Sequence, residues 1–178
     1  MAQDGNGAGK PKILLAEDNP VVRKGAEHFL AEWGYETIVA NDGDAAWRIL
    51  EEDRSIRLAI VDWNMPGLSG IQICQRLRTR TGPYVYTIIF SARKSYEAKI
   101  MALDGGADDY LVKPCKPSEL RARLGVGRRI VETAMSPCPA QPPSSPPEKQ
   151  QDAPKDTPEE DIAPGTPEPK DIPDKEEK

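Results

Sequence analysis

The sequence predicts an α/β fold in which helices cover both faces of a doubly wound, five-stranded parallel sheet. Between residues 12 and 135, five short apolar runs alternate with five helical patterns. The runs are continuously apolar, as in strands that are buried on both faces of a sheet. Residues 136–178 hold 12 of the 18 prolines and no aromatic residue. We therefore expect a flexible N-terminus over 1–11, a folded domain with an extended last helix over 12–135, and a disordered, acidic, Pro-rich tail over 136–178.

Each predicted strand is a short run, rich in β-forming residues, between turn residues. Parallel strands need a crossover between them, and a helical pattern follows each of the first four runs. In chain order the runs are Ile13–Ala16, Thr37–Ala40, Leu58–Val61, Val85–Phe90 and Tyr110–Val112.

The first helix has the clearest start, because Asn19 is a good N-cap and Pro20 suits the first helical position. Gly34 is predicted to end this helix. Its apolar stripe consists of Val22, Ala26, Phe29 and Trp33. Further helices are predicted over Asp44–Glu52, Gly70–Thr79, Tyr96–Leu103 and Pro117–Met135. Gly125 and Gly127 would each weaken the last of them by about 1 kcal/mol.

Composition excludes several classes of protein. The formal net charge of −5 argues against a general nucleic-acid binder, which needs a basic face to neutralise phosphates. The uncharged apolar runs, including Ile13–Ala16 and Val85–Phe90, are far shorter than the roughly 20 residues of a membrane helix. Residues 1–10 are Gly-rich and lack the apolar core of a secretory signal. Three cysteines at scattered positions predict neither a disulfide framework nor a zinc site, and they fit the reducing cytoplasm.

Reactive side chains follow four of the five predicted strands. They are Glu17 and Asp18, then Asp62, Ser91 and Lys113. The carboxyl ends of parallel strands share one edge of the sheet, where ligands bind in such folds. Three carboxylates held close together repel one another, so they must either raise a pKa or bind a cation. A small, open site made of oxygen atoms suits Mg²⁺, and a carboxylate beside that ion can attack phosphorus.

The motifs occur in a fixed order along the chain: Glu17-Asp18, Val-Asp62-Trp-Asn-Met-Pro-Gly-Leu-Ser-Gly70, Phe-Ser91-Ala, and Asp-Asp-Tyr110-Leu-Val-Lys113-Pro114. Together they resemble the receiver domain of two-component response regulators. The resemblance covers about residues 12–130, which is nearly the whole predicted domain. It implies a flavodoxin-like sheet with the strand order 2-1-3-4-5.

The resemblance also implies a role for each residue of the predicted site. Asp62 would accept a phosphoryl group from a histidine kinase or a phosphotransfer protein. Ser91 and Lys113 would bind the phosphoryl oxygens, and a cis peptide bond would follow Lys113. The ligands of Mg²⁺ would be Asp18, Asp62, the backbone carbonyl of Asn64 and, through water, Glu17.

Two further roles follow from the same resemblance. Tyr110 matches the switch aromatic, which turns inward when the Ser91 hydroxyl moves toward the phosphate. This movement would change the surface made by the fourth helix, the fifth strand and the fifth helix. Asn64 and Arg93 would flank the path of the attacking water and so tune the rate of dephosphorylation.

Five other polar or reactive residues are interpreted as structural. Asp108 and Asp109 are expected to be solvated, and His28 is expected to face solvent. Cys74 and Cys115 are interpreted as small apolar residues.

The predicted function is that of a stand-alone response regulator, because 43 residues after position 135 are too few for an output domain. Such a protein is not an enzyme beyond its own phosphorylation and dephosphorylation. Its partners would be a sensor kinase or phosphotransfer protein and a downstream protein. We expect no direct contact with nucleic acid and no insertion into a membrane. The last helix is a candidate dimer contact. A phosphorelay intermediate or phosphate sink is one alternative. A metal-dependent phosphatase or phosphotransferase is another.

Overall fold

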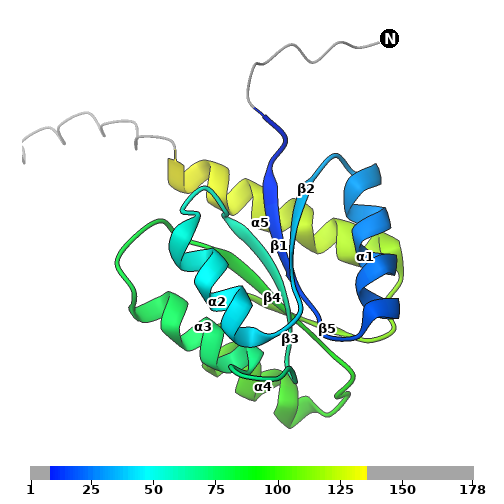
Figure 1. Cartoon of the computed structure of the whole chain (residues 1–178). Coiled ribbons are helices and arrows are strands. Elements are labelled where there is room, and N and C mark those ends of the chain that lie inside the picture. Colours follow the sequence, from blue (N-terminus) through cyan, green and yellow to red (C-terminus); the bar gives the residue numbers. More distant parts are fainter. Residues whose placement is uncertain (1–8, 136–178) are drawn as a thin grey trace, which may run out of the picture. The chain divides into compact units, whose positions relative to one another are not determined.

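The computed structural model describes residues 9–135. The predictions of a flexible N-terminus and a disordered tail therefore lie, for residues 1–8 and 136–178, outside the described residues. Five strands alternate with five helices along the described chain (Figure 1): β1 (Lys12–Ala16), α1 (Pro20–Glu32), β2 (Glu36–Ala40), α2 (Gly43–Glu52), β3 (Leu58–Asp62), α3 (Gly70–Thr79), β4 (Tyr86–Ser91), α4 (Tyr96–Asp104), β5 (Asp109–Val112) and α5 (Pro117–Met135).

The strands form one parallel sheet in the order β2-β1-β3-β4-β5, which confirms the predicted fold class. The direction in which strands are added reverses between β1 and β3. Strand β2 lies on one side of β1, whereas β3, β4 and β5 follow one another on the other side. In a sheet of this kind the crevice for a ligand lies at that reversal, outside the carboxyl ends of the strands.

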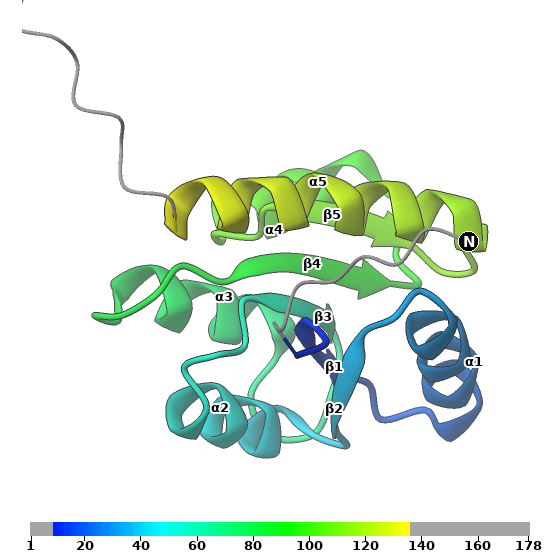
Figure 2. The same cartoon turned by 90° about the horizontal axis from the view of Figure 1, so that it is seen from above.

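Helices α1 and α5 cover one face of the sheet, and α2, α3 and α4 cover the other (Figure 2). Each face has its own apolar core, as expected for strands buried on both sides. The larger fully buried side chains of the sheet include Ile13, Leu14, Leu15, Leu58, Ile60, Ile88, Ile89 and Leu111.

Helix α1 begins as the sequence predicts. The side chain of Asn19 accepts hydrogen bonds from the backbone N–H groups of Val21 and Val22, at 2.9 and 3.3 Å. Its apolar stripe differs from the prediction, because Leu30 is fully buried while Phe29 is only half-buried. The stripe is therefore centred closer to Leu30, and Phe29 is left at the rim of a cavity.

The expectation that Asp108 and Asp109 are solvated is wrong. Arg78 of α3 reaches Asp108 with an N–O distance of 2.8 Å, and Arg123 of α5 contacts both carboxylate oxygens of Asp109 at 2.7 Å. The backbone N–H of Thr87 also donates to Asp108 at 2.7 Å. Both aspartates therefore fasten the start of β5 to its neighbours, and each side chain is only 16% exposed.

The other structural interpretations are confirmed where they can be followed. His28 is exposed and lies 3.5 Å from Glu32 on the same helix. Cys74 is fully buried, and burial raises the pKa of its thiol to about 12. Cys115 is half-buried, and burial likewise raises its pKa. No helix among residues 9–135 has the length and apolar character to cross a membrane.

Candidate functional site

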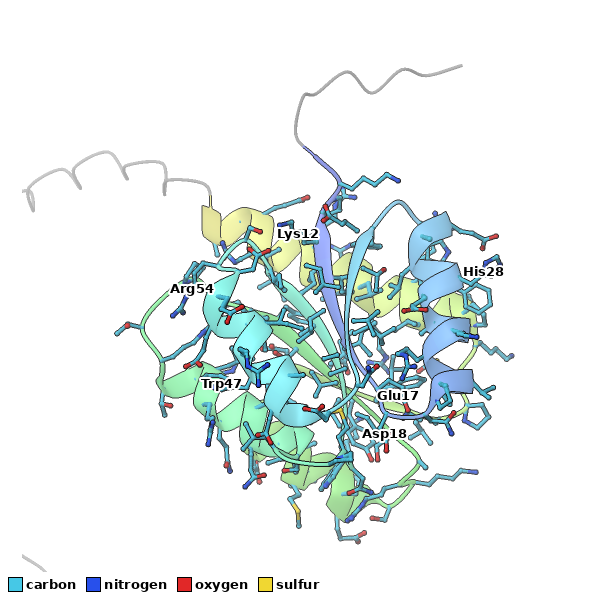
Figure 3. The ribbon with its side chains drawn as sticks, viewed as in Figure 1. Lys12, Glu17, Asp18, His28, Trp47 and Arg54 are labelled. Atoms are coloured by element: carbon cyan, nitrogen blue, oxygen red, sulfur yellow. The ribbon has the colours of Figure 1, made fainter. Side chains whose placement is uncertain are left out.

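The strand register brings the predicted site residues to one edge of the sheet. Glu17 follows the last residue pair between β1 and β3, level with Asp62. Lys113 follows the last pair between β4 and β5, of which Ser91 is a member. Figure 3 shows Glu17 at the opposite end of β1 from Lys12. Four strands thus contribute to one site at their carboxyl ends.

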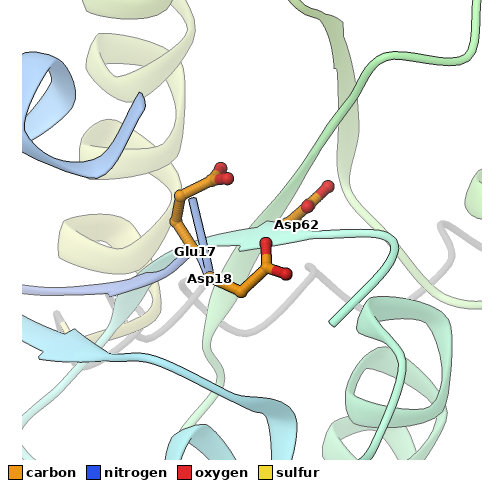
Figure 4. Close-up of side chains that lie close together, drawn as sticks. All are labelled: Glu17, Asp18 and Asp62. Carbon is orange, nitrogen blue, oxygen red and sulfur yellow. The ribbon is translucent and has the colours of Figure 1, made fainter. Parts of the chain in front are cut away.

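Three carboxylates meet at this edge (Figure 4). Glu17, Asp18 and Asp62 each offer an oxygen atom, and these atoms all lie within 4.8 Å of one another. Glu17 and Asp62 are buried, whereas Asp18 is exposed. Within the part of the chain that the structure describes, no other group of three or more candidate metal-binding side chains gathers in this way.

Lys113 places its ammonium group between two of these carboxylates. Its Nζ lies 2.5 Å from Oε2 of Glu17 and 3.2 Å from Oδ1 of Asp62. The same atom lies 5.0 Å from the centre of the Phe90 ring, in a cation–π contact. The peptide bond between Lys113 and Pro114 is cis, as the resemblance implies. The lysine therefore holds the carboxylates together in place of an external cation.

Glu17 has one carboxylate oxygen that is satisfied and one that is not. Oε2 accepts the hydrogen bond of Lys113, but the buried Oε1 has no hydrogen-bond partner among the described residues. Burial raises the pKa of Glu17 above its usual value, although the hydrogen bond from Lys113 acts in the opposite direction. An unpartnered buried carboxylate oxygen is costly unless a cation or water meets it. The donor set of three carboxylates and this free oxygen fits Mg²⁺.

Ser91 and Tyr110 are linked through one residue of the loop over 92–95. The buried Oγ of Ser91 accepts a hydrogen bond from the backbone N–H of Arg93 at 3.2 Å. The hydroxyl of Tyr110 donates to the backbone carbonyl of Arg93 at 2.8 Å. Tyr110 is buried, so the predicted switch aromatic already points inward in this structure.

Trp63, directly after Asp62, closes this set of contacts. Its ring meets Tyr110 edge to face at 6.2 Å and 88°, and the guanidinium of Arg93 lies 4.7 Å over it. We call these three residues the Trp63–Arg93–Tyr110 cluster. It connects the end of β3 with the loop before α4 and with β5, beside the predicted phosphoacceptor.

The loop after β3 folds back on the strand end. The backbone N–H of Gly70 donates to the carbonyl of Trp63 at 3.0 Å. A Cβ atom on Gly70 would lie 2.4 Å from the backbone oxygen of Asp62, so this position requires glycine. Asn64 lies in this loop and is exposed. The roles predicted for the Asn64 carbonyl as a metal ligand, and for Asn64 and Arg93 in dephosphorylation, stay predictions.

Sequence reasoning missed a cavity beside the site. A hollow of about 590 Å³ runs from the acidic cluster along α1 to the start of α5. Its apolar wall includes Val22, Phe29, Cys115 and Leu120. The signal for it in the sequence was Val21, an apolar residue in the first turn of α1 outside the predicted stripe, which proves to be exposed at the mouth.

Comparison with known proteins relates most of the described chain to response regulators. A family model described as "Response regulator receiver domain" matches residues 13–125. The chain is 41% identical over 114 residues to the response regulator RppA of Synechocystis sp., covering 64% of this chain and 48% of that protein. It is 38% identical over 127 residues to the probable transcriptional regulator ycf27 of Porphyridium aerugineum, covering 71% and 52%. It therefore spans about half the length of these curated relatives.

Solved receiver domains have the same fold. The receiver domain of the Francisella response regulator 1452 is 34% identical, with a TM-score of 0.62, and the alignment covers 67% of this chain and 98% of that one. A response regulator receiver domain protein from Clostridium thermocellum is 28% identical, with a TM-score of 0.65 and coverage of 70% and 98%. The family match over residues 13–125 includes the acidic cluster and all but the first residue of the sheet.

Proposed function

Because the chain belongs to the response regulator receiver domain family, we propose that it accepts a phosphoryl group on Asp62 and passes the signal on through a protein contact. The observation that carries the proposal is the meeting of Glu17, Asp18, Asp62 and Lys113 at one edge of the sheet. Three carboxylates whose oxygen atoms lie within 4.8 Å of one another are unfavourable as a purely structural arrangement, even with the Lys113 ammonium against two of them. The arrangement suits the handling of a phosphate and a cation.

The proposed reaction is a transfer from a phosphorylated histidine of a kinase or phosphotransfer protein. A carboxylate oxygen of Asp62 attacks phosphorus, the O–P bond forms, and the P–N bond of the donor breaks with its electron pair going to the imidazole. Asp18, Asp62 and the Asn64 carbonyl, with Glu17 through water, would hold a Mg²⁺ ion, which would neutralise charge on the transferring group.

Lys113 then has two positions in the proposed cycle. At rest it bridges Glu17 and Asp62. When Asp62 carries the phosphoryl group, the ammonium can contact a phosphoryl oxygen while it keeps its bond to Glu17. The Ser91 hydroxyl donates to a second phosphoryl oxygen, and its link through Arg93 carries the shift to Tyr110.

The cavity supports the approach of a protein donor rather than a free small molecule alone. It opens from the acidic cluster, and its wall along α1 and α5 is largely apolar. Such a wall can bury the apolar side chains of a donor while its phosphohistidine reaches Asp62. We propose that the protein is a cytoplasmic adapter that carries the signal to a downstream protein. A relay intermediate or phosphate sink is the alternative.

The central test is phosphorylation of the full chain by a small phosphodonor with Mg²⁺, followed by phosphate-affinity electrophoresis. We expect a mobility shift in the parent protein and none in Asp62→Asn, because the amide cannot act as the nucleophile. The matched control is Asp104→Asn, an exposed aspartate outside the cluster, which should shift like the parent.

The same experiment separates the proposal from phosphatase or phosphotransferase activity. A receiver binds one phosphoryl group per chain, and its turnover is limited by its own hydrolysis. Release of many phosphates per chain without a phosphorylated protein would contradict the proposal and favour the enzyme. A shift that survives in Asp62→Asn would move the phosphoacceptor elsewhere.

A further inference from the structure

Helix α4 exposes apolar side chains on its outer surface. Tyr96 is 72% exposed, Met101 57% and Ile100 37%, while Ala98 and Ala102 face the core. These three account for a large part of the exposed bulky apolar residues among residues 9–135. Apolar side chains gathered on one helix in this way indicate a contact surface rather than chance exposure.

The exposed side chains line a groove against the neighbouring helix. The groove has a volume of about 750 Å³ and lies between α3 and α4. We call it the α3–α4 groove; its lining is Ile71, Gln75, Tyr96, Glu97, Ile100, Met101, Asp104 and Gly105. A groove between two helices can take one further helix, which here would pack apolar side chains against Ile100 and Met101.

The charges of the groove restrict its occupant. Glu97 and Asp104 are its two charged lining residues, and both are acidic. They lie seven positions apart on α4, which places them about 10 Å apart along the helix axis with Ile100 and Met101 between them. This pattern complements an amphipathic helix whose apolar face is flanked by basic residues two turns apart. The tail of this chain is a poor candidate, because residues 136–178 hold 11 acidic residues and 5 lysines.

The groove is connected to the phosphorylation site by a continuous set of contacts. A second hollow of about 520 Å³ shares Glu97 and Met101 with it and reaches Arg93. Arg93 is bonded through its backbone to Ser91 and Tyr110, as described above. A shift of Ser91 therefore displaces the residue that lines the end of this second hollow, next to the groove.

We propose that the α3–α4 groove is the docking site for a partner's basic amphipathic helix, and that phosphorylation of Asp62 changes its affinity. The dependence on phosphorylation rests on the proposed function, whereas the groove and its charge pattern do not. The proposal places the output contact on the α3 side of α4. On the β5 and α5 side, ion pairs of Arg123 with Asp109 and Glu119 occupy the surface instead.

The test uses the full chain and two fluorescent peptides about five helical turns long, one of Leu and Lys and the other of Leu and Glu in the same pattern. Fluorescence anisotropy gives the affinity with Mg²⁺ alone and with Mg²⁺ and beryllium fluoride as a phosphoryl mimic. We expect the Leu/Lys peptide to bind, the Leu/Glu peptide to bind about tenfold more weakly or not at all, and beryllium fluoride to change the affinity.

Two double variants locate the site. Tyr96→Ser with Met101→Ser should weaken binding about tenfold, because exposed apolar anchors are lost while the core stays intact. The matched control is Val126→Ser with Ile130→Ser, two partly exposed apolar residues on α5, which should bind like the parent. Glu97→Lys with Asp104→Lys should reverse the preference between the two peptides.

Three results would overturn the docking site. The first is equal binding of both peptides, and the second is a greater loss of peptide affinity in the α5 control than in the groove variant. The third is self-association of the protein that the groove variant abolishes, because a second copy would then be the occupant. Phosphorylation of each variant is measured in parallel. Binding in the groove without phosphorylation of Asp62 would contradict the proposed function alone, and phosphorylation with unchanged affinity would contradict the gating alone.

Discussion

Lys113 determines the charge that the site carries before a ligand enters. Its ammonium contacts two of the three carboxylates, those of Glu17 and Asp62. Three ionised carboxylates and one ammonium have a formal charge of −2. A divalent cation neutralises this charge, whereas a monovalent cation leaves residual repulsion. The resident lysine therefore favours a divalent ion.

Arg93 offers a direct test of the Trp63–Arg93–Tyr110 cluster. Arg93→Ala removes the guanidinium over Trp63 and should lower the free energy of unfolding by about 0.5–1 kcal/mol. It should also change the lifetime of the phosphorylated protein, because the loop over 92–95 loses a contact beside Asp62. Urea unfolding and decay of the phosphorylated form measure the two effects.

The matched control for Arg93 is Arg76→Ala, which removes the guanidinium 5.4 Å from Trp47, at the contact of α3 with α2. It should have a similar effect on stability and none on the lifetime of the phosphorylated protein. Equal lifetimes in both variants would show that the cluster only packs.

Asp53 provides a dependence on pH away from the site. Lys12 contacts it at 2.7 Å, and this bond, with two more from Ser55, lowers the pKa of Asp53 to about 2. Since the folded pKa lies below the unfolded value of 3.8, the pair stabilises the fold at higher pH, and this contribution is lost as the pH falls toward about 2. The contribution is small, because the carboxylate is 31% exposed.

The variant Asp53→Asn tests this reading by urea unfolding across the acid range. Its deficit in stability relative to the parent should shrink as the pH falls from about 5 to about 2. A deficit that stays constant would mean that the pair contributes no pH dependence.

The contrast between predicted and misread residues has a physical cause. Glu17, Asp62, Ser91 and Lys113 could be placed because they follow predicted strands, and parallel strands end at one edge. The partners of Asp108 could not be placed, because Arg78 is 30 positions away and reaches it only through the packing of α3 against β4, next to the turn before β5. Long side chains that bridge elements leave no periodic signal in the sequence.

At the scale of the elements, helix α5 is the informative case. Two glycines interrupt its sequence, yet it runs unbroken from Pro117 to Met135. Gly127 is buried, and a Cβ there would lie 2.4 Å from the ring of Tyr86, so the helix can lie close to β4 only without a side chain. Propensity predicted the cost of this glycine, but only the packing shows its reason. For the other helices, caps and apolar runs were enough to predict the bounds to within a residue or two. Helix α2, for example, begins at Gly43, one residue before its predicted start.

The two glycines of α5 should respond to alanine in opposite ways. Gly127→Ala should destabilise the protein by about 1–3 kcal/mol, because Tyr86 must move from a packed position. Gly125→Ala should stabilise it by about 0.5–1 kcal/mol, since its nearest neighbour, Nη1 of Arg129, would lie 3.9 Å from the new Cβ. Urea unfolding of both variants measures this, and a loss of stability in both would contradict the packing argument.

At the scale of the whole molecule, the chain joins two segments of unlike composition. Residues 136–178 hold 11 acidic residues and 5 lysines, whereas the preceding residues hold 18 acidic and 19 basic ones. The acidity of the chain and its excess of proline thus belong to the segment after α5. The fold was predictable at this scale because alternating strands and helices permit few topologies.

Deletion of residues 136–178 tests whether that segment takes part in the chemistry. We expect phosphorylation of Asp62 by a small phosphodonor to keep its rate within about twofold, because every residue of the acidic cluster precedes the deletion. Phosphate-affinity electrophoresis of both forms gives the rates. A large loss in the truncated form, with its thermal unfolding unchanged, would assign the segment a part in the reaction.

The position of the site at one edge of the sheet has a consequence for protein engineering. All the residues of the acidic cluster lie at the carboxyl ends of the strands, so the loops that enter the strands from the opposite edge are spared. One of them, between α3 and β4, is exposed at Thr81 and Gly82. An inserted tag or binding module there would report on the protein without entering its reacting edge. Loops at the carboxyl edge of the sheet should therefore not tolerate insertions, whereas loops at the opposite edge should.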